Sequence, residues 1–574
     1  MEIEFIKTDV LIIGSEGAGA RAAIAACENG ADVVVLSKAY QGRSGATITA
    51  PGDYACDSKT LFELGITGAN PSDTIDKFYE DIMIGGKYLN IPLLAERLAI
   101  DSGKRLKDLL NYGAKFTVVH QYGGHTLPRG ACAGKVGKTG VNIMKALGSK
   151  AKVSGARLFQ ACFTIDLLFE DDIICGAITW DIKSGKLIIF EAPSVIITTG
   201  GFARIWGRTS NPEESTGDGI AMALRAGAEL LDCEMVQFIP YALVKPPAAE
   251  GHIYFSIELL SLLNSYLRNS DGERFMYRYD PERLERSTRD FLSLGIASEV
   301  NQGRGCSSGG IKVDISHIPK ETLEQLVENM FPKWKVGAFS LPKFGFDPYQ
   351  DAMEIAPVAH YCNGGIKIDT NCCTNIKGLY AAGEVAGGVQ GANRLSGCAI
   401  TETQVYGAIA GKEAANHALK YRCKPLIPKY QVEEAKDLIK IFFEKQKRLD
   451  TVWSIRNKIH ELADKNVGVL REATGLQDTL KSLNNLNRDI LNNLRIDTEE
   501  LQCNYELIAS MEAINMLKVL EGVVKAALIR KETIGSHNRT DFPQKDIQNY
   551  HTILSKKGLN TIIKKQVILK SNIG

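Results

Sequence analysis

The most restrictive feature of this sequence is a strand–helix–strand unit at its N-terminus. Residues 8–13 (TDVLII) and 31–37 (ADVVVLS) are short apolar runs typical of buried parallel strands. The segment between them, GSEGAGARAAIAACENG, predicts a glycine turn and a helix that ends near Gly30. Such a unit places the unpaired N–H groups of a helix start where a dinucleotide pyrophosphate binds. We therefore expect an α/β fold with a dinucleotide site; a βαβ unit without a ligand is the alternative.

The glycine pattern departs from the usual fingerprint in two ways. G-x-G-x-x-G maps onto Gly14, Glu16 and Gly19, so a glutamate occupies the middle position. Gly17, beside it, is expected to allow the close backbone approach. The acidic residue that usually ends the second strand is also absent, and Ser37 and Lys38 stand there.

A second glycine-rich stretch, residues 355–400, predicts the floor of a flavin site. It contains His360, a GLYAAGE turn with Glu384, and QGANRL with Arg394, and a helix is expected directly after it, over 399–419. The positive end of that helix would stabilise the anion of a reduced flavin. Glu384 would bind the ribityl end, while His360 and Arg394 would hold an anionic substrate. A glycine turn before a buried helix, with His360 satisfied in the core, is the other interpretation.

Three further segments carry candidate site residues. The loop QGRSGATITAPGD (41–53) has the small and hydroxylated residues that suit a loop against a cofactor. His125 and Arg129, in GGHTLPRGACAGKVGKTG, either line the active site or cap a strand. Asp218 begins a helix predicted from about Gly217, where it caps the helix, contacts the flavin, or does both.

The spacing of these segments predicts the domain organisation. Regular βαβ spacing stops between 233 and 354, which indicates an inserted α+β capping domain that excludes water from the flavin. Residues 430–449, 452–464 and 505–529 show apolar residues at helical spacing. We expect a Rossmann-like FAD-binding domain in two parts (1–232 and 355–421), the cap (233–354), a C-terminal helical domain (422–545) and a tail (546–574).

Composition narrows the partners. A formal net charge of +1 gives no electrostatic case for nucleic acid or a membrane surface. No apolar run approaches the roughly 20 residues of a membrane span, and MEIEFIKTD is not a secretory signal, so we expect no direct membrane insertion and a cytoplasmic location. The 13 cysteines form no CxxC, so neither an iron–sulfur cluster nor zinc is expected in this chain.

Taken in order, these motifs resemble the flavoprotein subunits of fumarate reductases and succinate dehydrogenases. That family includes L-aspartate oxidase, thiol:fumarate reductase catalytic subunits and adenylylsulfate reductase flavoproteins. The resemblance covers about residues 6–543, and rests on motifs such as IIGSEGAGARAAI, SKAYQGRSGAT, STGDGIAMALRAGAEL, TRDFLSLGIASEVNQGRG, AHYCNGGIKID and GLYAAGEVAGGVQGANRL. The ordered set is specific for the family and much less so for the substrate.

The resemblance implies roles for individual residues. Arg289 is implied as the proton donor from the cap, with His360 and Arg394 as carboxylate ligands, and His125 and Arg129 are further candidate substrate ligands. The implied reaction is reduction of fumarate or a related enoate by hydride transfer from FAD N5, with electrons from a separate iron–sulfur subunit. The implied FAD-binding residues are Gly14, Gly17, Gly19, Ser37, Lys38, Ser44, Thr49, Gly52, Asp218, Glu384, Arg394, Ser396 and Ala399.

Departures from the family pattern leave other interpretations open. Family members with covalent FAD attach it through a histidine just after the second strand. No histidine precedes His120 in this sequence, so we expect non-covalent FAD. The family's QFHPT reads QFIPY here, with Ile239 in place of a histidine, and Leu263 stands where a proton-relaying glutamate is expected; Glu258 substitutes only if the cap is rearranged. An oxidase or reductase of another anion, such as L-aspartate or adenylylsulfate, is one alternative. A non-catalytic flavin electron-transfer subunit is another, against which the presence of Arg289, His360 and Arg394 argues.

Overall fold

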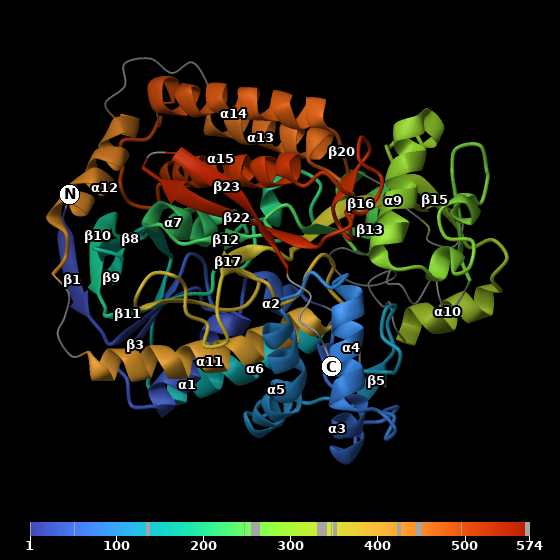
Figure 1. Cartoon of the computed structure of the whole chain (residues 1–574), viewed down its shortest axis with the longest axis horizontal. Coiled ribbons are helices and arrows are strands. Elements are labelled where there is room, and N and C mark those ends of the chain that lie inside the picture. Colours follow the sequence, from blue (N-terminus) through green and yellow to red (C-terminus); the bar gives the residue numbers. More distant parts are fainter. Residues whose placement is uncertain are drawn as a thin grey trace.

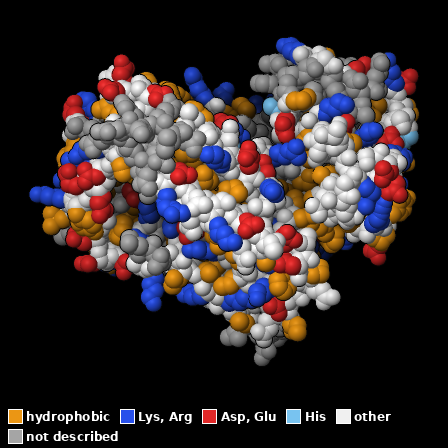
Figure 2. Space-filling model, turned by 90° about the horizontal axis from the view of Figure 1, so that it is seen from above, with side chains coloured by type: hydrophobic (Ala, Val, Ile, Leu, Met, Phe, Trp, Pro, Cys, Tyr) orange, Lys and Arg blue, Asp and Glu red, His pale blue; other side chains and the backbone are white. Residues whose placement is uncertain are grey.

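A computed structural model describes residues 2–50, 52–133, 138–245, 247–253, 264–329, 341–345, 347, 353–421, 426–443, 451–494, 496–558 and 560–568. It has a broad body and a lobe at one end that carries α9, α10 and β15 (Figure 1). Figure 2 shows this lobe set off from the body by an indentation, with charges of both signs interspersed over the visible face. None of the described helices is long and apolar enough to cross a bilayer.

A five-stranded parallel sheet organises the body, in the order β18-β11-β2-β3-β7. Its central strands are the predicted N-terminal pair, in register from Val10 opposite Val33 to Ile13 opposite Leu36. Every residue of these two strands is buried, which explains their continuous apolar sequence. The strand bounds are β2 (Val10–Ile13), β3 (Val33–Ser37), β7 (Arg157–Gln160), β11 (Ser194–Ile197) and β18 (Leu379–Ala381).

Two long helices pack together below this sheet in Figure 1, α1 (Gly17–Glu28) and α11 (Cys398–Lys420). Glycines on α11 allow the close approach: a Cβ at Gly407 would lie 2.6 Å from the Ala18 carbonyl oxygen, and one at Gly411 would lie 2.2 Å from that of Ala22. Both helices were predicted from the sequence, and both are confirmed. The helices that follow α1 along the chain are α2 (Ala46–Thr49), α3 (Ser58–Glu63), α4 (Ile75–Gly85), α5 (Pro92–Asn111) and α6 (Thr139–Val153).

Two smaller sheets complete the N-terminal part of the body. One has four strands: β1 (Ile3–Lys7), β10 (Lys186–Glu191), β9 (Ile173–Asp181) and β8 (Cys162–Glu170). The other has three: β4 (Tyr54–Ala55), β6 (Gly130–Cys132) and β5 (Val118–His120).

The expected cap is a four-stranded antiparallel sheet with helices. The sheet is ordered β13 (Val236–Lys245), β16 (Met353–Cys362), β15 (Ile311–Asp314) and β14 (Tyr266–Arg268), with α9 (Arg289–Glu299) and α10 (Lys320–Asn329). Leu292 and Ile296 of α9 share an apolar cluster with Ile239 and Val358 of the sheet. Short helical turns are η1 (Ala203–Ile205), η2 (Pro247–Ala249), η3 (Phe275–Arg278), η4 (Leu284–Arg286), η5 (Val300–Arg304) and η7 (Leu341–Phe344).

The C-terminal region is helical, as predicted. Its helices are α12 (Lys429–Phe443), α13 (Val452–Asn466), α14 (Ala473–Asn493) and α15 (Tyr505–Ile529), and a short parallel pair links β20 (Leu470–Arg471) to β21 (Asn538–Arg539). The helix α14 had no counterpart among the predicted elements. The predicted helix 430–449 is confirmed as far as Phe443, and its last residues lie outside the described part of the chain.

The tail, which carried no sequence signal, forms a hairpin. Its strands β22 (Tyr550–Lys557) and β23 (Asn560–Val567) extend a sheet made by β19 (Ala386–Gly387), β17 (Gly365–Lys367) and β12 (Leu230–Leu231). Buried Arg530 ties the end of α15 to this sheet through Asp232 (2.9 Å) and Glu234 (2.5 Å). Charged residues such as Lys564 and Lys565 at the open edge weaken the alternating apolar pattern by which such strands are normally found.

Candidate active site

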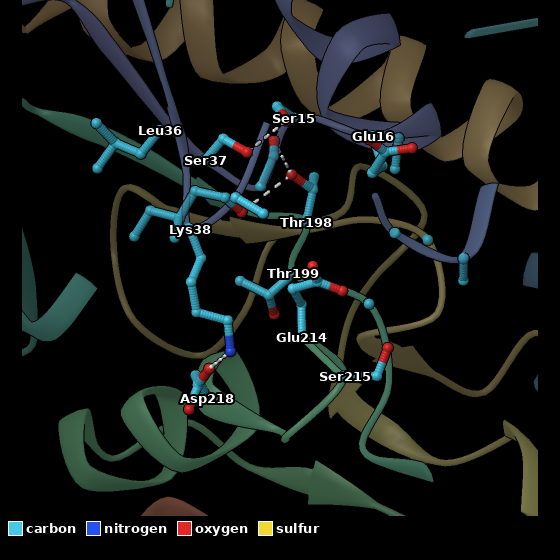
Figure 3. A pocket seen from close by; sticks show the side chains of 18 of the residues that line it. Ser15, Glu16, Leu36, Ser37, Lys38, Thr198, Thr199, Glu214, Ser215 and Asp218 are labelled. Atoms are coloured by element: carbon cyan, nitrogen blue, oxygen red, sulfur yellow. Dashed lines mark hydrogen bonds and ion pairs between the residues drawn. The ribbon is translucent and has the colours of Figure 1, made fainter. Parts of the chain in front are cut away.

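A cavity lies where β2 and β3 end and α1 begins, and Figure 3 shows the side chains around it. The N-terminus of α1 faces this region with no side-chain cap of its own, which suits an anion such as a pyrophosphate. Of the predicted FAD-binding residues, those that line the cavity are Gly14, Gly17, Ser37, Lys38, Ser44, Asp218 and Glu384.

The glycines of the turn allow close packing of backbone on backbone. Gly14 has a φ of +112°, and an added Cβ there would lie 2.3 Å from the Thr198 carbonyl oxygen. Gly19 lies behind the turn, where a Cβ would come within 1.9 Å of the Gly14 carbonyl oxygen. A Cβ at Gly17 would meet the Thr47 hydroxyl at 2.9 Å. These positions thus have the steric roles expected of the fingerprint, and they fit a dinucleotide.

Lys38 crosses one wall of the cavity towards the start of α7 (Asp218–Ala226) (Figure 3). Its Nζ donates to Asp218 and to Glu512 of α15, at 2.7 Å each. Burial would raise the pKa of Asp218, but the charge and hydrogen bond of Lys38 outweigh it and hold that pKa below its usual range. Burial opposes the charge on Lys38 as well, yet the two carboxylates raise its pKa. Asn515 donates a further hydrogen bond to Asp218 at 2.8 Å.

Glu384 forms part of another wall. It accepts a hydrogen bond from the Cys362 backbone N–H at 3.0 Å, and burial raises its pKa to about 7. A Cβ at Gly201 would lie 2.3 Å from the Glu384 Oε1, so only a glycine fits against this carboxyl group. A carboxyl group in this place can accept hydrogen bonds from ribityl hydroxyl groups, and that contact stays a prediction.

The remaining predicted FAD residues lie outside the lining of this cavity; besides Gly19 these are Thr49, Gly52, Arg394, Ser396 and Ala399. Thr49 donates its hydroxyl to the Gly45 carbonyl oxygen at 3.1 Å. Ser396 and Ala399 flank the start of α11, where Gly397 adopts φ +82° and has Ala55 packed 2.9 Å from where its Cβ would be. Their contact with the flavin stays a prediction.

Two arginines converge from different parts of the fold. Arg289, at the start of α9 in the cap, and Arg394, before α11, both donate to Oε1 of buried Gln237, at 3.5 and 3.2 Å. Arg289 also donates to the Tyr241 hydroxyl and to Ser396 Oγ, at 3.3 Å each. In the described part of the chain Arg394 Nε is buried without a partner, and burial and the charge of Arg289 lower the pKa of Arg394. Such a pair suits the binding of an anion, and substrate contact by either arginine stays a prediction.

His360 lies beside this pair on β16. Its Nδ1 is 2.8 Å from Ser210 Oγ, and Asn211 donates to its carbonyl oxygen at 2.7 Å. Burial, and then the charges of Arg394 and Arg289, hold the pKa of His360 well below its ordinary value. The imidazole is therefore neutral at pH 7, and a Ser210 hydroxyl that donates to Nδ1 leaves the ring proton on Nε2.

His125 and Arg129 are both buried, with their hydrogen bonds directed at the protein. His125 Nε2 is 2.9 Å from the Ser396 carbonyl oxygen, and burial lowers its pKa to about 4. Arg129 is fully buried and donates Nε and Nη2 to Asp73 at 2.7 Å, and Nη1 to Asp81. These contacts favour a positioning role for Arg129, and substrate contact by either residue stays a prediction.

Sequence reasoning missed several neighbours of the site. Gln237 and Tyr241 belong to the segment QFIPY, whose departure from the family pattern lies at Ile239 between them. Ser210 and Glu512 had no local signal, because each reaches the site only through the tertiary fold. Ile239, at the position of that histidine, is buried in the apolar cluster of the cap, while Leu263 and Glu258 lie outside the described residues.

Comparison with known proteins agrees with this geometry. A model of the FAD binding domain matches residues 9–400, and a model of the fumarate reductase flavoprotein C-terminus matches residues 456–572. The chain is 36% identical over 553 residues to one subunit of the fumarate reductase (CoM/CoB) of Methanothermobacter marburgensis, covering 95% of this chain and 96% of that protein. L-aspartate oxidase of Acinetobacter baylyi is 29% identical over 95% and 96% of the two chains. The solved E. coli quinol fumarate reductase FrdA superposes with a TM-score of 0.89 at 26% identity, covering 100% and 98%.

Proposed function

Because this chain belongs to the fumarate reductase and succinate dehydrogenase flavoprotein family, we propose that it reduces fumarate or a related enoate. The family, the fold class and the FAD cofactor expected from the sequence are confirmed, and the chain is an FAD-dependent oxidoreductase that acts on a CH–CH group. The substrate and the residue roles below are the proposal.

The observation that carries the proposal is the arginine pair. Two guanidinium groups meet at the neutral Gln237 oxygen. The charges of Glu384 and Asp53 act on Arg394 and Arg289 respectively, but neither carboxyl group is seen in an ion pair with them in the described part of the chain. Holding two positive charges together in a largely enclosed place is unfavourable unless an anion binds between them. Arg394 offers a buried, unpartnered Nε, and its guanidinium is fixed over the Tyr361 ring at 4.4 Å. A substrate carboxylate would neutralise the two positive charges and accept a hydrogen bond from Arg394 Nε.

The neighbouring residues supply the remaining chemistry. Bound FAD supplies the hydride for one alkene carbon. Arg289 is placed to deliver the proton to the other, because it comes from the cap and has Tyr241 and Ser396 to orient it. Arginine is a weak acid, with a pKa above ~12. The positive charge of Arg289 nevertheless stabilises the carbanion that develops beside it, so the same guanidinium group can then protonate that carbon. His360 donates Nε2–H to a substrate oxygen.

We also propose how the enzyme is supplied and where it works. FAD is held without a covalent bond, since Arg43-Ser44-Gly45 stand where covalently linked family members have a histidine. Electrons come from a separate iron–sulfur subunit, as the family resemblance implies for a sequence whose 13 cysteines form no CxxC motif. The enzyme works in the cytoplasm, at a membrane only if a partner recruits it there.

The buried Ile239 favours a second candidate, a different anionic substrate. Its side chain packs in the apolar cluster of the cap and offers no hydrogen bond where the family pattern has a histidine. Family members with other substrates exist, as the L-aspartate oxidase similarity shows for that protein.

Anaerobic oxidation of chemically reduced viologen tests the proposal. Fumarate, adenylylsulfate and larger enoates are added separately, and L-aspartate is tested as a reductant of the oxidised protein. Rapid viologen oxidation with fumarate supports the proposal. Turnover with another of these compounds and none with fumarate assigns that compound instead. Flavin absorbance is measured in each sample, so that an absence of turnover is not mistaken for a loss of FAD.

A further inference from the structure

Glu16 occupies the place of the middle glycine in the fingerprint, and its side chain contacts the backbone of the loop that follows β3. It is the N-cap residue of α1 but makes no capping hydrogen bond with its side chain. Oε1 instead accepts the backbone N–H of Gly42 at 3.3 Å. The backbone N–H of Ile48 also favours the charged form of the carboxyl group. The side chain therefore lies beneath the segment 41–48.

This segment, which we call the cover segment, is shaped around that carboxyl group. A Cβ at Gly45 would lie 2.5 Å from the Glu16 Cγ, and the φ of Gly45 is +94°, so two independent constraints require glycine there. Gln41 donates to the Ser15 carbonyl oxygen at 2.9 Å, and Gly17 N–H to Thr47 Oγ1 at 3.3 Å. The cover segment is thus fastened to the glycine turn at several points.

The cover segment also closes the dinucleotide cavity on one side. Ser44, Gly45 and Thr47 line the cavity, while Arg43 is exposed to solvent. FAD in this cavity therefore leaves more easily when the segment moves away. Glu16 lies at the side of the cavity opposite Lys38 (Figure 3), so the contacts of the lysine do not replace this fastening.

The enclosure of the Glu16 carboxyl group disfavours its charge. Oε2 is buried and has no hydrogen-bond partner among the described residues. Burial raises the pKa of Glu16 to about 7, the N–H groups of Gly42 and Ile48 oppose this, and the charge of Glu214 across the cavity adds to it. An unpartnered oxygen that carries negative charge costs more than a neutral one.

We propose that Glu16 is a proton-dependent latch that holds the cover segment over the FAD cavity, so that FAD is bound more tightly while the Glu16 carboxyl group is protonated. With the segment open, the carboxyl group is hydrated and titrates near its ordinary pKa of ~4.3. The closed state therefore binds the proton more tightly than the open state. Closure is most favoured below this ordinary pKa, weakens as pH rises towards 7, and changes no further above it.

Other charged groups at the cavity define the controls. Glu214 faces Glu16, the exposed Arg43 lies on the cover segment itself, and Lys38 and Asp218 are paired with each other. Glu384 also has a pKa raised to about 7 by burial, and it contributes its own pH dependence. The signal is therefore the difference between the wild type and Glu16→Gln, a variant that keeps size and an acceptor oxygen but cannot ionise.

The test measures the Kd of FAD for the apo-protein by flavin fluorescence at pH 5.0, 7.0 and 8.5. One unit of pKa difference between open and closed states corresponds to a tenfold change in the closing equilibrium. We expect the wild-type Kd to rise at least about tenfold more than that of Glu16→Gln between pH 5.0 and 8.5. Glu63→Gln, on an exposed face of α3, should follow the wild type. Equal pH dependence in wild type and Glu16→Gln overturns the proposal.

Hydrogen exchange of the amides 42–48 in the apo-protein gives a readout of the segment itself. After correction for the intrinsic exchange rate, we expect opening to increase with pH in the wild type and to stay constant in Glu16→Gln. Glu16→Gly, which restores the fingerprint glycine, should exchange fast at every pH. Protection that is independent of pH in the wild type refutes the latch, whatever the FAD affinity does.

Discussion

Replacing Lys38 by methionine should lower the free energy of unfolding at neutral pH, and the contacts of its Nζ indicate by how much. Methionine keeps the length of the side chain but removes the Nζ that contacts Asp218 and Glu512 at 2.7 Å. Breaking a buried pair by removing one partner costs about 3–5 kcal/mol. Asn515 still donates to Asp218, and Arg456 still pairs with Glu512 at 2.9 Å, so we expect about 2–4 kcal/mol.

Thermal unfolding of the apo-protein measures this loss without interference from FAD affinity. An unfolding entropy of ~2.1 cal/mol/K per residue over a 574-residue chain converts the loss into a Tm decrease of roughly 2–3 °C. Lys7→Met is the matched control, because the Lys7–Glu191 pair is on the surface and should contribute at most ~1 kcal/mol. A Tm of Lys38→Met equal to that of Lys7→Met would refute the reasoning.

The pH dependence of the same comparison has a fixed sign. The pKa of Asp218 is lowered in the folded protein, against burial, by Lys38. Its contribution is therefore complete above the unfolded pKa of ~3.9 and is lost as pH falls through the lower folded pKa. The Tm difference between wild type and Lys38→Met should be constant from pH 5 to 9 and shrink below pH 4. A difference that grows on acidification would show that the pair is not ionised as described.

Three further outcomes are expected. Gly19→Ala should lower both Tm and FAD content, because its Cβ would lie 1.9 Å from the Gly14 carbonyl oxygen. Gly148→Ala is the control: the nearest atom to its Cβ would be 3.6 Å away, so it should be neutral by both measures, and equal effects of the two substitutions would contradict the packing argument. Gln237→Leu should weaken substrate affinity at least tenfold without loss of FAD, because Arg289 and Arg394 lose the oxygen to which both donate. Substrate affinity is measured from the change in flavin absorbance on titration, and an unchanged affinity would show that Gln237 is not part of the site. FAD should appear in the supernatant after acid precipitation, and flavin that stays in the pellet would contradict non-covalent binding.

Much of the fold was predictable because its signals are local. The buried strands ending at Ile13 and Ser37 follow from continuous apolar runs, and the helix after Gly397 follows from spacing and a glycine turn. The C-terminal hairpin was not predictable. Its inner strand is buried by β12, which lies more than 300 residues earlier, and its outer strand is an edge with charged residues.

The candidate site was predictable where a motif carries the chemistry. Lys38 and Asp218 were named as separate cofactor residues, yet their direct pairing, and the part played by Glu512 from the last long helix, depend on tertiary packing. The meeting of Arg289 with Arg394 at Gln237 likewise joins two domains. No spacing within either segment encodes such a distance.

The central claim, that Arg289 protonates a substrate held by Arg394, is tested most directly by single-turnover kinetics. Chemically reduced, FAD-loaded protein is mixed anaerobically with fumarate, and flavin reoxidation is followed by absorbance in wild type, Arg289→Ala and Arg394→Ala. We expect rapid reoxidation in the wild type. Arg289→Ala should still bind fumarate through Arg394, with lower affinity, and at saturating fumarate should reoxidise at least a hundredfold more slowly. Arg394→Ala should lose binding as well. Reoxidation of Arg289→Ala at the wild-type rate would contradict the account.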